Sequence, residues 1–594
     1  MPTYQPPLQD IRFVLQDYLN LSGQTGLAGF AEATPDIVDA ILEEGAKFAG
    51  EVLGPLNRTG DQEGCKFENG VVRTPPGFRE AYKTYVENGW GGLSSDPDYG
   101  GQGLPRTLSM AVNEMCSAAN MAFAMYPGLT HGAYSALTLH GSEAQKALYL
   151  PKLVSGIWAG TMNLTEPQCG TDLGLIKTRA VPRSDGRYSI TGTKIFISAG
   201  EHDLAENIIH LVLARIEGAP EGTKGISLFV VPKFAVKADG SLGARNGVSC
   251  GSIEHKMGIH GNATCVLNYD DAVGELVGEA NKGLRAMFTM MNEARAGVAM
   301  QGLAQAAVAY QNAAAYAKER IQGRALSGPK EQDKPADPII VHPDVRRMLM
   351  NARALTEGGR ALLYWAALQG DIAARSSDEA ARERAEDMRS VLTPVLKAYL
   401  TEEGFKAAVE SQQVWGGHGY IAENGMEQFV RDARIAMIYE GANGIQALDL
   451  VGRKLPANGG RAVFGFFKLI DDLLAETKDD AALKPWRDGL SGARQDLETA
   501  TQWLMQNAFS NPENAGAVSM DYLYIFALTG LAFVWTGMVK TAQAKAGTGD
   551  AAFYADKIAT GRYFLACVLP DIKSRLLRLQ AGAEPMLALA ADRF

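Results

Sequence analysis

The spacing of apolar residues changes character twice along this chain, and each change marks an expected domain boundary. Over residues 1–155 the apolar positions recur at helical spacing, as Ile37, Val38 and Ile41 do behind a Thr-Pro-Asp start signal. We therefore expect a mainly helical N-terminal domain.

From 156 to 282 the apolar runs become short and alternating or β-branched. The run Tyr188–Ser198 alternates and ends at a glycine, while 208–214 and 226–231 lie between turn signals. Strands of this kind, separated by Gly, Asp and Pro, predict a small β-barrel or sandwich.

Helical spacing returns at about residue 283, and a Pro-Ala-Asn-Gly-Gly run ending at 460 predicts a linker. The remaining residues have the pattern of a further helical domain. The expected fold class is mainly α with a central β-domain. The expected parts are an N-terminal helical domain (1–155), a β-domain (156–282), a helical bundle (283–454) and an additional C-terminal helical domain (462–594).

One stretch, 522–539, carries no charge over 18 residues and reaches the lower length of a membrane span. Thr529 and Gly530 interrupt it, and Lys540 follows at once. We favour a buried helix in an all-helical domain, because a secure span needs about 20 strongly apolar residues. A membrane partner is therefore not expected.

Composition narrows the class of protein. Hydrophobic residues make up 46% and charged residues 21% of the chain, as in ordinary soluble enzymes. The net charge of −10 disfavours nucleic acid as the main partner, because a phosphate-binding surface needs clustered Lys and Arg. The six cysteines form no Cys-x-x-Cys pair and the eight histidines show no metal-ligand spacing. We expect reduced thiols, no metal and a cytoplasmic location, since no signal peptide is recognised.

Several polar motifs interrupt the apolar pattern. The first, Leu-Thr-Glu-Pro-Gln-Cys-Gly-Thr-Asp at 164–172, offers N–H groups and hydroxyls that suit a flat heterocycle and a pyrophosphate. A helix cap with Asp172 as the capping residue is the alternative. Lys-Ile-Phe-Ile-Ser-Ala-Gly at 194–200 also suits a plain strand, and Met-Asn-Glu-Ala-Arg at 291–295 also suits a surface helix with a local ion pair.

Three further features lie downstream. They are Ala-Lys-Glu-Arg-Ile-Gln-Gly-Arg at 317–324, Gln-Val-Trp-Gly-Gly-His-Gly-Tyr at 413–420, and a Tyr-Glu-Gly sequence that contains Glu440. Glu440 lies 23 residues after Gly417. An isolated carboxylate here would most simply form an interhelical ion pair. No Gly-x-Gly-x-x-Gly follows a predicted strand, so a Rossmann-type nicotinamide site is not supported.

Taken together, these motifs resemble the acyl-CoA dehydrogenase family over about residues 1–454, with the added C-terminal domain of the longer bacterial members. The resemblance implies an acyl-CoA substrate and FAD as cofactor. It places Leu164 and Thr165 at the isoalloxazine edge, Thr171 near the diphosphate, Phe196 behind the flavin and Ser198 at flavin N5. It also implies FAD contacts across a dimer interface by Arg320, Gln322, Gln413 and Gly417.

The resemblance further implies that Arg295 faces the CoA side of the cavity and that Asn292 contacts the pantetheine, and it makes Glu440 the base that removes the α-proton. Some family branches carry the base immediately before the arginine, but this chain has Ala294 there. Ala442 and Gly444 replace a more usual Thr and Gln, so FAD contacts at that loop are expected to be altered or lost.

The chemistry explains why the family uses a buried glutamate. A free Glu has a pKa of about 4.3, far below that of a thioester α-proton. Excluding water raises the carboxyl pKa, and donors aimed at the thioester oxygen stabilise the enolate. In the family the β-hydrogen passes to FAD N5 as a hydride, and electrons leave to an electron-transferring flavoprotein.

Three alternatives stay open from the sequence. The substrate could be a short or medium straight-chain acyl-CoA, or the flavin could be reoxidised by oxygen as in an acyl-CoA oxidase. A helical scaffold without activity is the alternative from a different class. We expect a homodimer or larger homo-oligomer, as the resemblance implies.

Overall fold

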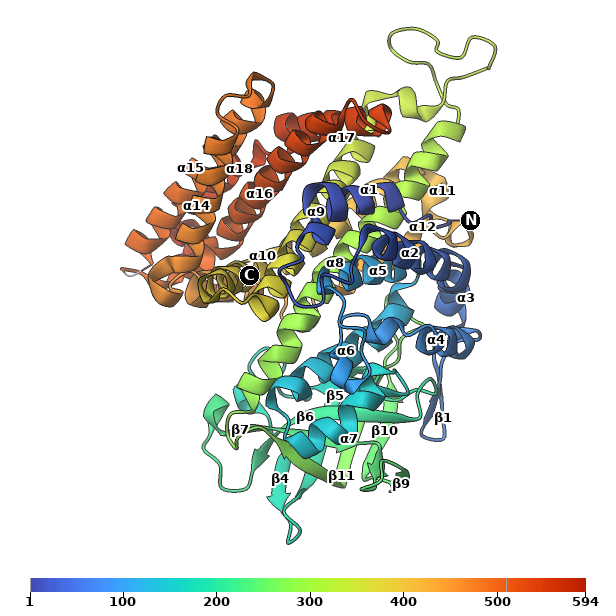
Figure 1. The fold of residues 1–594 in the computed structure, drawn as a ribbon, viewed down its shortest axis with the longest axis vertical. Coiled ribbons are helices and arrows are strands. Elements are labelled where there is room, and N and C mark those ends of the chain that lie inside the picture. The colour runs from blue at the N-terminus through green and yellow to red at the C-terminus, as the bar shows by residue number, and fades with distance from the viewer. Residues whose placement is uncertain (1, 509) are drawn as a thin grey trace. The chain divides into compact units, whose positions relative to one another are not determined.

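The computed structural model describes residues 2–508 and 510–594, and the chain forms two compact units (Figure 1). The barrel unit comprises Gly45–Pro105 and Met115–Gly297. The helical unit comprises Met1–Glu44, Arg106–Glu114 and Val298–Phe594. The C-terminal helices thus belong to the same compact unit as the helical bundle that precedes them.

A closed ring of five strands forms the centre of the barrel unit. Neighbours pair in the order β11, β5, β4, β6 and β7, and β7 pairs with β11 again to close the ring. β10 adds to β11, and β3 adds to β6 in parallel. The strands are β3 (Trp158–Asn163), β4 (Arg179–Pro182), β5 (Tyr188–Ser198), β6 (Asn207–Ile216), β7 (Ile226–Pro232), β10 (Val248–Ile253) and β11 (Thr264–Val277). The expected small β-domain is confirmed as a barrel.

β6 explains why its sequence lacks the alternation seen in β5. Val212 points into the core cluster inside the barrel, while its neighbours Leu211 and Leu213 pack in a second core cluster with Leu137 and Leu150. Those two leucines lie on α6 (Met121–His140) and α7 (Glu143–Val154). A strand buried on both faces carries apolar side chains on both, which is why 208–214 is apolar at every position except the buried His210.

The region expected to be mainly helical also holds a β-hairpin. β1 (Lys66–Glu68) and β2 (Val71–Arg73) pair around Asn69 and Gly70, both with positive φ. An Asn-Gly pair with positive φ at both positions is a strong hairpin signal that the helical assignment overlooked. A second small hairpin joins β8 (Phe234–Val236) and β9 (Leu242–Arg245). The other helices here are α3 (Gly54–Glu63) and α4 (Phe78–Glu87).

Asp61 on α3 and His260 form a pH-sensitive contact inside the barrel unit. Nδ1 of His260 lies 2.9 Å from Oδ1 of Asp61, and Nε2 lies 2.7 Å from the Lys256 carbonyl oxygen. The hydrogen bond to Asp61 raises the pKa of His260 to about 9, above its ordinary value of 6.5. The protonated ring, which donates from both nitrogens, is therefore the form that the fold stabilises.

This contact predicts a loss of stability on the alkaline side. A raised folded-state pKa gives stabilisation that is complete below about pH 6.5 and disappears as the pH rises through about 9. Because the ring is partly exposed, we expect about 1–2 kcal/mol. Thermal unfolding from pH 6 to pH 10 should show this loss in the wild type and a flatter profile in His260→Gln. Equal slopes in both proteins would contradict the assignment.

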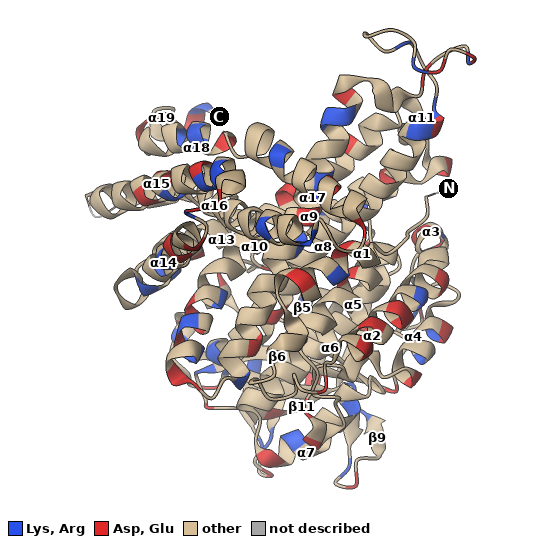
Figure 2. Ribbon diagram, turned by 45° about the horizontal axis from the view of Figure 1, so that its top comes forward, with Lys and Arg blue, Asp and Glu red and all other residues tan. Residues whose placement is uncertain are grey.

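The helical unit is built from helices that range from single turns to α10, with 36 residues. They are α1 (Leu8–Arg12), α5 (Arg106–Ala119, whose first part lies in this unit), α8 (Gly283–Glu319, from Val298), α9 (Pro343–Arg375), α10 (Glu379–Val414), α11 (Gly417–Tyr420), α12 (Met426–Ile435), α13 (Asn443–Asp449), α14 (Arg461–Glu476), α15 (Lys484–Asn507), α16 (Pro512–Lys545), α17 (Ala551–Tyr563), α18 (Asp571–Gln580) and α19 (Glu584–Leu587). α2 (Pro35–Lys47) ends in the barrel unit. Figure 2 shows acidic and basic residues interspersed along these helices.

α16 contains the uncharged stretch and lies at the centre of the C-terminal helices. Among the described residues it is the one helix long and apolar enough to cross a membrane, and its apolar window is entirely buried within the protein. It packs closely on α9, where a Cβ at Gly358 would stand 2.4 Å from Nε1 of Trp535. This burial is what a core helix shows, and it supports the buried-helix interpretation.

A buried network of charges joins the N-terminal helix, the bundle and the C-terminal helices. Nε of Arg360 on α9 lies 2.9 Å from Oε1 of Glu114, and the Arg360 guanidinium also contacts Asp10 on α1. Nζ of Lys557 on α17 contacts Asp10 as well and lies 2.6 Å from Oε2 of Glu357 on α9. Burial alone would raise the pKa of Asp10, but Lys557 and Arg360 hold it below its usual value. The network therefore stays charged.

Candidate active site

Glu440 lies on the turn between α12 and α13, in the helical unit. The turn is closed by the Asn443 amide N–H, which donates to the Met437 carbonyl at 3.1 Å. Nε2 of Gln446 donates to the Gly441 carbonyl at 2.9 Å. Gly441 has a φ of 74°, which glycine adopts without strain. The Glu440 side chain is half-buried, so it is partly withdrawn from water without being sealed.

Asn443 anchors the far side of this turn. Its side chain is 5% exposed, and its Oδ1 accepts a hydrogen bond of 2.9 Å from Nζ of Lys397 on α10. Its Nδ2 donates to Oε1 of Glu402 at 3.2 Å, five residues further along α10. Asn443 therefore ties the start of α13, and with it the Glu440 turn, to α10.

Tyr439 anchors the near side. Its hydroxyl donates to Oε1 of Gln301 on α8. Burial raises the pKa of Tyr439 far above its ordinary value, so the hydroxyl remains a donor at any working pH. Glu440 thus lies between two side chains that are fixed to α8 and α10. Sequence reasoning missed Gln301, Lys397 and Asn443, because their pairing depends on the fold and not on spacing.

In the barrel unit, a buried ion pair holds the 164–172 motif against β5. Nζ of Lys194 lies 2.8 Å from Oε1 of Glu166, with side chains 0% and 3% exposed. The same ammonium donates to the Leu164 carbonyl at 2.9 Å. Burial alone would raise the pKa of Glu166, yet Lys194 and the hydrogen bonds from Thr178 and Lys177 lower it to about 2. The carboxylate is therefore a structural clamp, a role that the sequence did not indicate.

The clamp lies beside an aromatic ring and a hydroxyl on β5 and a second hydroxyl on the segment that follows β3. Phe196 is 59% exposed with a φ of 59°, and the β5–β11 register shifts beside it. A bulky residue in the left-handed region is strained, and such strain concentrates at functional sites. The hydroxyls of half-buried Thr165 and Ser198 form no hydrogen bond within residues 2–508 and 510–594. An exposed ring with two available hydroxyls fits a flat polar cofactor such as the FAD isoalloxazine.

Asp172 caps a helix, as the alternative interpretation of the 164–172 motif predicted. Its Oδ1 accepts from the Gly174 amide at 2.9 Å and caps a short 3-10 helix, Leu173–Leu175. Thr171 is exposed beside it. The motif therefore contains a helix cap, and the Thr165 and Thr171 hydroxyls remain available for a cofactor.

Asn292 and Arg295 lie one turn apart on the part of α8 that belongs to the barrel unit. Nη1 of Arg295 donates to Oδ1 of Asn292 at 3.3 Å, and the guanidinium lies 5.8 Å from the Phe288 ring centroid. Arg295 is 4% exposed, so this arginine does not lie on a surface face of the helix. A buried arginine suits binding of an anionic or strongly polar ligand.

The remaining four predicted residues lie on exposed segments of the helical unit. Arg320 and Gln322 follow the end of α8, and Gln413 and Gly417 flank the end of α10; all four are exposed. Tyr316 of α8 stacks on Trp415 with ring centroids 4.3 Å apart, which brings these two stretches together. Arg320 offers a guanidinium, and Gly417 carries no side chain that would keep a ligand from its backbone.

Two buried histidines in the barrel unit serve the fold. Nδ1 of His210 on β6 lies 2.7 Å from Oγ1 of Thr161 on β3. Burial lowers the pKa of both His202 and His210 to about 3. Both histidines are therefore neutral at working pH, as expected for buried residues that stabilise the fold.

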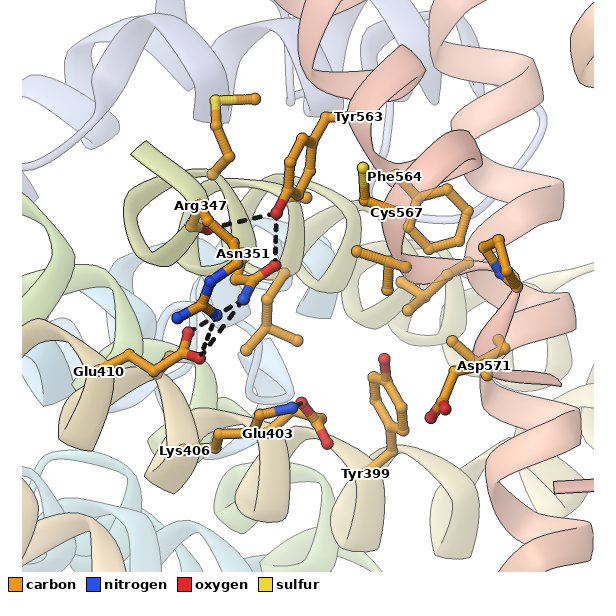
Figure 3. Close-up of a pocket in the computed structure, with 18 of the residues that line it drawn as sticks. Arg347, Asn351, Tyr399, Glu403, Lys406, Glu410, Tyr563, Phe564, Cys567 and Asp571 are labelled. Carbon is orange, nitrogen blue, oxygen red and sulfur yellow. Dashed lines mark hydrogen bonds and ion pairs between the residues drawn. The ribbon is translucent and has the colours of Figure 1, made fainter. Parts of the chain in front are cut away.

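A separate cavity of about 950 Å³ lies in the helical unit, between α9, α10 and the C-terminal helices (Figure 3). Its wall includes Tyr399 and Glu403 of α10, Tyr524 of α16 and Tyr563 of α17. Glu440 does not line it. The cavity marks where the C-terminal helices meet the bundle.

The fold and these sites define a flavin-dependent dehydrogenase: a small barrel that presents an exposed ring with hydroxyls, and a helical bundle that holds a carboxylate on a fixed turn. Sequence profiles agree. Those described as the N-terminal, middle and C-terminal domains of acyl-CoA dehydrogenase match residues 38–157, 161–272 and 281–455. One described as "Acetyl-CoA dehydrogenase C-terminal like" matches 466–590.

The chain belongs to the acyl-CoA dehydrogenase family, and it is an FAD-dependent oxidoreductase. It is 44% identical to the 3-methylmercaptopropionyl-CoA dehydrogenase of Ruegeria pomeroyi, over 98% of this chain and 99% of that protein. It is 34% identical to a butyryl-CoA dehydrogenase of Syntrophomonas wolfei, over 100% and 99% of the two chains. An acyl-CoA dehydrogenase of Bacillus anthracis complexed with FAD shares the fold at 22% identity, with a TM-score of 0.74 over 93% of this chain and 89% of that chain.

Proposed function

We propose that this enzyme oxidises 3-(methylthio)propanoyl-CoA to methylthioacryloyl-CoA, a step of dimethylsulfoniopropionate breakdown. The observation that carries the proposal is 44% identity over practically the whole length of a relative named for this substrate. The alignment covers 98% of this chain and 99% of that relative, so it includes the C-terminal helices.

Glu440 is the proposed base. Its turn is held from both sides by Tyr439 and Asn443, which limits the positions that the carboxylate can take. A base acts only when it reaches the proton it removes, and fixed geometry supplies much of the rate.

The residues of the barrel unit would hold FAD. Thr165 and Ser198 offer hydroxyls, Phe196 offers a ring face, and the Glu166–Lys194 pair keeps them in place. Bound FAD supplies a two-electron acceptor for the β-hydrogen. The chain's own contribution is to orient the thioester and to hold the α-proton acceptor.

A butyryl-CoA dehydrogenase activity is the second candidate, because a relative of that name matches the chain from end to end at 34% identity. The sharpest test uses pentanoyl-CoA, in which a methylene replaces the sulfur of 3-(methylthio)propanoyl-CoA and the chain length stays the same. We expect kcat/KM to favour the thioether by about 10-fold, since one group in an apolar pocket changes binding by about 1–3 kcal/mol. Faster turnover of butanoyl- or pentanoyl-CoA would contradict the substrate proposal.

Electron-transferring flavoprotein is the proposed acceptor, and a cytoplasmic homodimer or larger homo-oligomer is the proposed form. The exposed positions of Arg320, Gln322, Gln413 and Gly417 support an FAD contact that a second subunit completes. Oxygen consumption with stoichiometric hydrogen peroxide, in the absence of any other acceptor, would instead identify an oxidase.

A further inference from the structure

We propose that Tyr524, on α16 of the C-terminal helices, is a positioning residue for Glu440 and acts through Glu402 and Asn443. The inference rests on the proposed role of Glu440 as the base. It gives the C-terminal helices a part in the proton-transfer step, beyond their part in the fold.

A chain of hydrogen bonds runs from α16 to the Glu440 turn. The Tyr524 hydroxyl donates to Oε2 of Glu402 at 2.6 Å. The other carboxylate oxygen, Oε1, accepts from Nδ2 of Asn443 at 3.2 Å. Asn443 is the first residue of α13 and lies three positions after Glu440. One carboxylate oxygen of Glu402 therefore accepts from Tyr524, and the other accepts from Asn443.

The orientation of Asn443 is fixed by its second contact. Its Oδ1 accepts from Nζ of Lys397 at 2.9 Å, and an ammonium group only donates. The amide oxygen must therefore face Lys397, and the amide NH₂ must face Glu402 and Thr401. A shift of the Glu402 carboxylate would therefore change the hydrogen bond that holds Asn443 at the start of α13.

Tyr524 is itself held firmly. It is 4% exposed, its ring meets the edge of Tyr399 at a centroid distance of 5.2 Å, and the Arg575 guanidinium lies 3.7 Å above its ring centroid. Nη1 of Arg575 lies 3.2 Å from Oδ1 of Asp521 on the same helix. Burial raises the pKa of Tyr524 well beyond its ordinary value, so the hydroxyl always donates. Charged acceptors make stronger hydrogen bonds, so Glu402 is well restrained.

The experiment compares Tyr524→Phe with Tyr522→Phe, a matched control on the same helix. The Tyr522 hydroxyl lies 2.9 Å from Oγ1 of Thr501, so its hydrogen bond joins two of the C-terminal helices. Both variants lose one buried hydroxyl. In anaerobic mixing of holoenzyme with saturating 3-(methylthio)propanoyl-CoA, we expect Tyr524→Phe to bleach the flavin about 10-fold more slowly.

Three readouts separate positioning from general damage. Tyr524→Phe should keep its FAD content and should bind a non-oxidisable thioester analogue within about twofold of the wild type, as expected when only transition-state alignment is lost. Tyr522→Phe should bleach at the wild-type rate. Equal bleaching rates in the two variants would overturn the proposal, and so would a loss confined to thioester affinity.

Glu402→Gln tests the same route from the bundle side and keeps the proposal testable if Tyr524→Phe does not accumulate as holoenzyme. Because the two residues act in series, the double variant should bleach no more slowly than the slower single variant. Multiplied losses would show independent effects and overturn the route. If Glu440→Gln bleached the flavin at the wild-type rate, the proposed role of Glu440 as the base would be wrong. That result is distinct from a failure of the Tyr524 proposal.

Discussion

Replacing Glu440 by glutamine should slow flavin bleaching by about 10³- to 10⁴-fold, the upper range for loss of a general base. The amide has nearly the shape of the carboxylate but cannot accept the α-proton. The neighbouring contacts of Tyr439 with Gln301 and of Asn443 with Lys397 do not involve the Glu440 side chain, so the turn should keep its form. Stopped-flow absorbance of the flavin under anaerobic conditions measures the rate.

A matched control is Glu423→Gln, an exposed glutamate in the 3-10 helix Ala422–Asn424 just before α12. This variant should bleach at the wild-type rate, and both variants should remain yellow with full FAD content. A Glu440→Gln enzyme that bleaches within a few-fold of the wild type would show that another group takes the proton. Ala294 could not be that group, because it has no proton-accepting side chain.

Replacing Lys557 by methionine should have the largest effect on stability. Lys557 is 1% exposed and neutralises two buried carboxylates, Asp10 and Glu357. Among the described residues, removing the ammonium leaves Asp10 paired only with Arg360 and Glu357 only with Arg353, so the buried site carries an uncompensated negative charge. Loss of one partner of a buried ion pair costs about 3–5 kcal/mol. Asp10 lies on α1, Glu357 on α9 and Lys557 on α17. Because the network joins these three helices, the substitution should lower the free energy of unfolding of the whole helical unit.

Lys540→Met provides the comparison. Nζ of Lys540 pairs with Glu476 on the surface, with side chains 40% and 59% exposed. An exposed pair contributes at most about 1 kcal/mol, because water and salt screen it. Chemical unfolding should therefore separate the two variants by more than about 2 kcal/mol. Similar midpoints for both would mean that the buried network relaxes around the lost charge.

The sequence was most informative where one local rule decided the structure. The alternation of Tyr188–Ser198 matches β5 at both ends, because one face of that strand points into the barrel core. The interruptions in 522–539 did not break α16, since Thr529 satisfies its hydroxyl by donating to the Ile525 carbonyl at 2.8 Å. The hairpin at 66–73 was overlooked because two short strands are outweighed by the helices around them.

The site residues likewise fall into those that a local motif indicates and those that only the fold brings together. Glu440, Arg295 and Phe196 could be proposed from the sequence because they lie in motifs with family spacing, and the burial of Arg295 excludes the alternative of a surface position. The clamp Glu166–Lys194 joins residues 28 positions apart, and the Tyr524–Glu402 bond joins residues 122 positions apart. Pairings of this kind depend on how the elements pack, and no local pattern in the chain encodes them. The links that restrain the Glu440 turn therefore emerge only from the structure.

Deuterium exchange at the α-carbon tests directly whether Glu440 removes the α-proton. Anaerobic holoenzyme is incubated in D₂O with 3-(methylthio)propanoyl-CoA, and deuterium at C2 of the recovered thioester is measured by mass spectrometry for the wild type and for Glu440→Gln. If Glu440 is the base, the wild type should exchange the α-proton and the variant practically not at all, although the variant should still bind FAD and thioester. Exchange at the wild-type rate in Glu440→Gln would show that Glu440 is not the base.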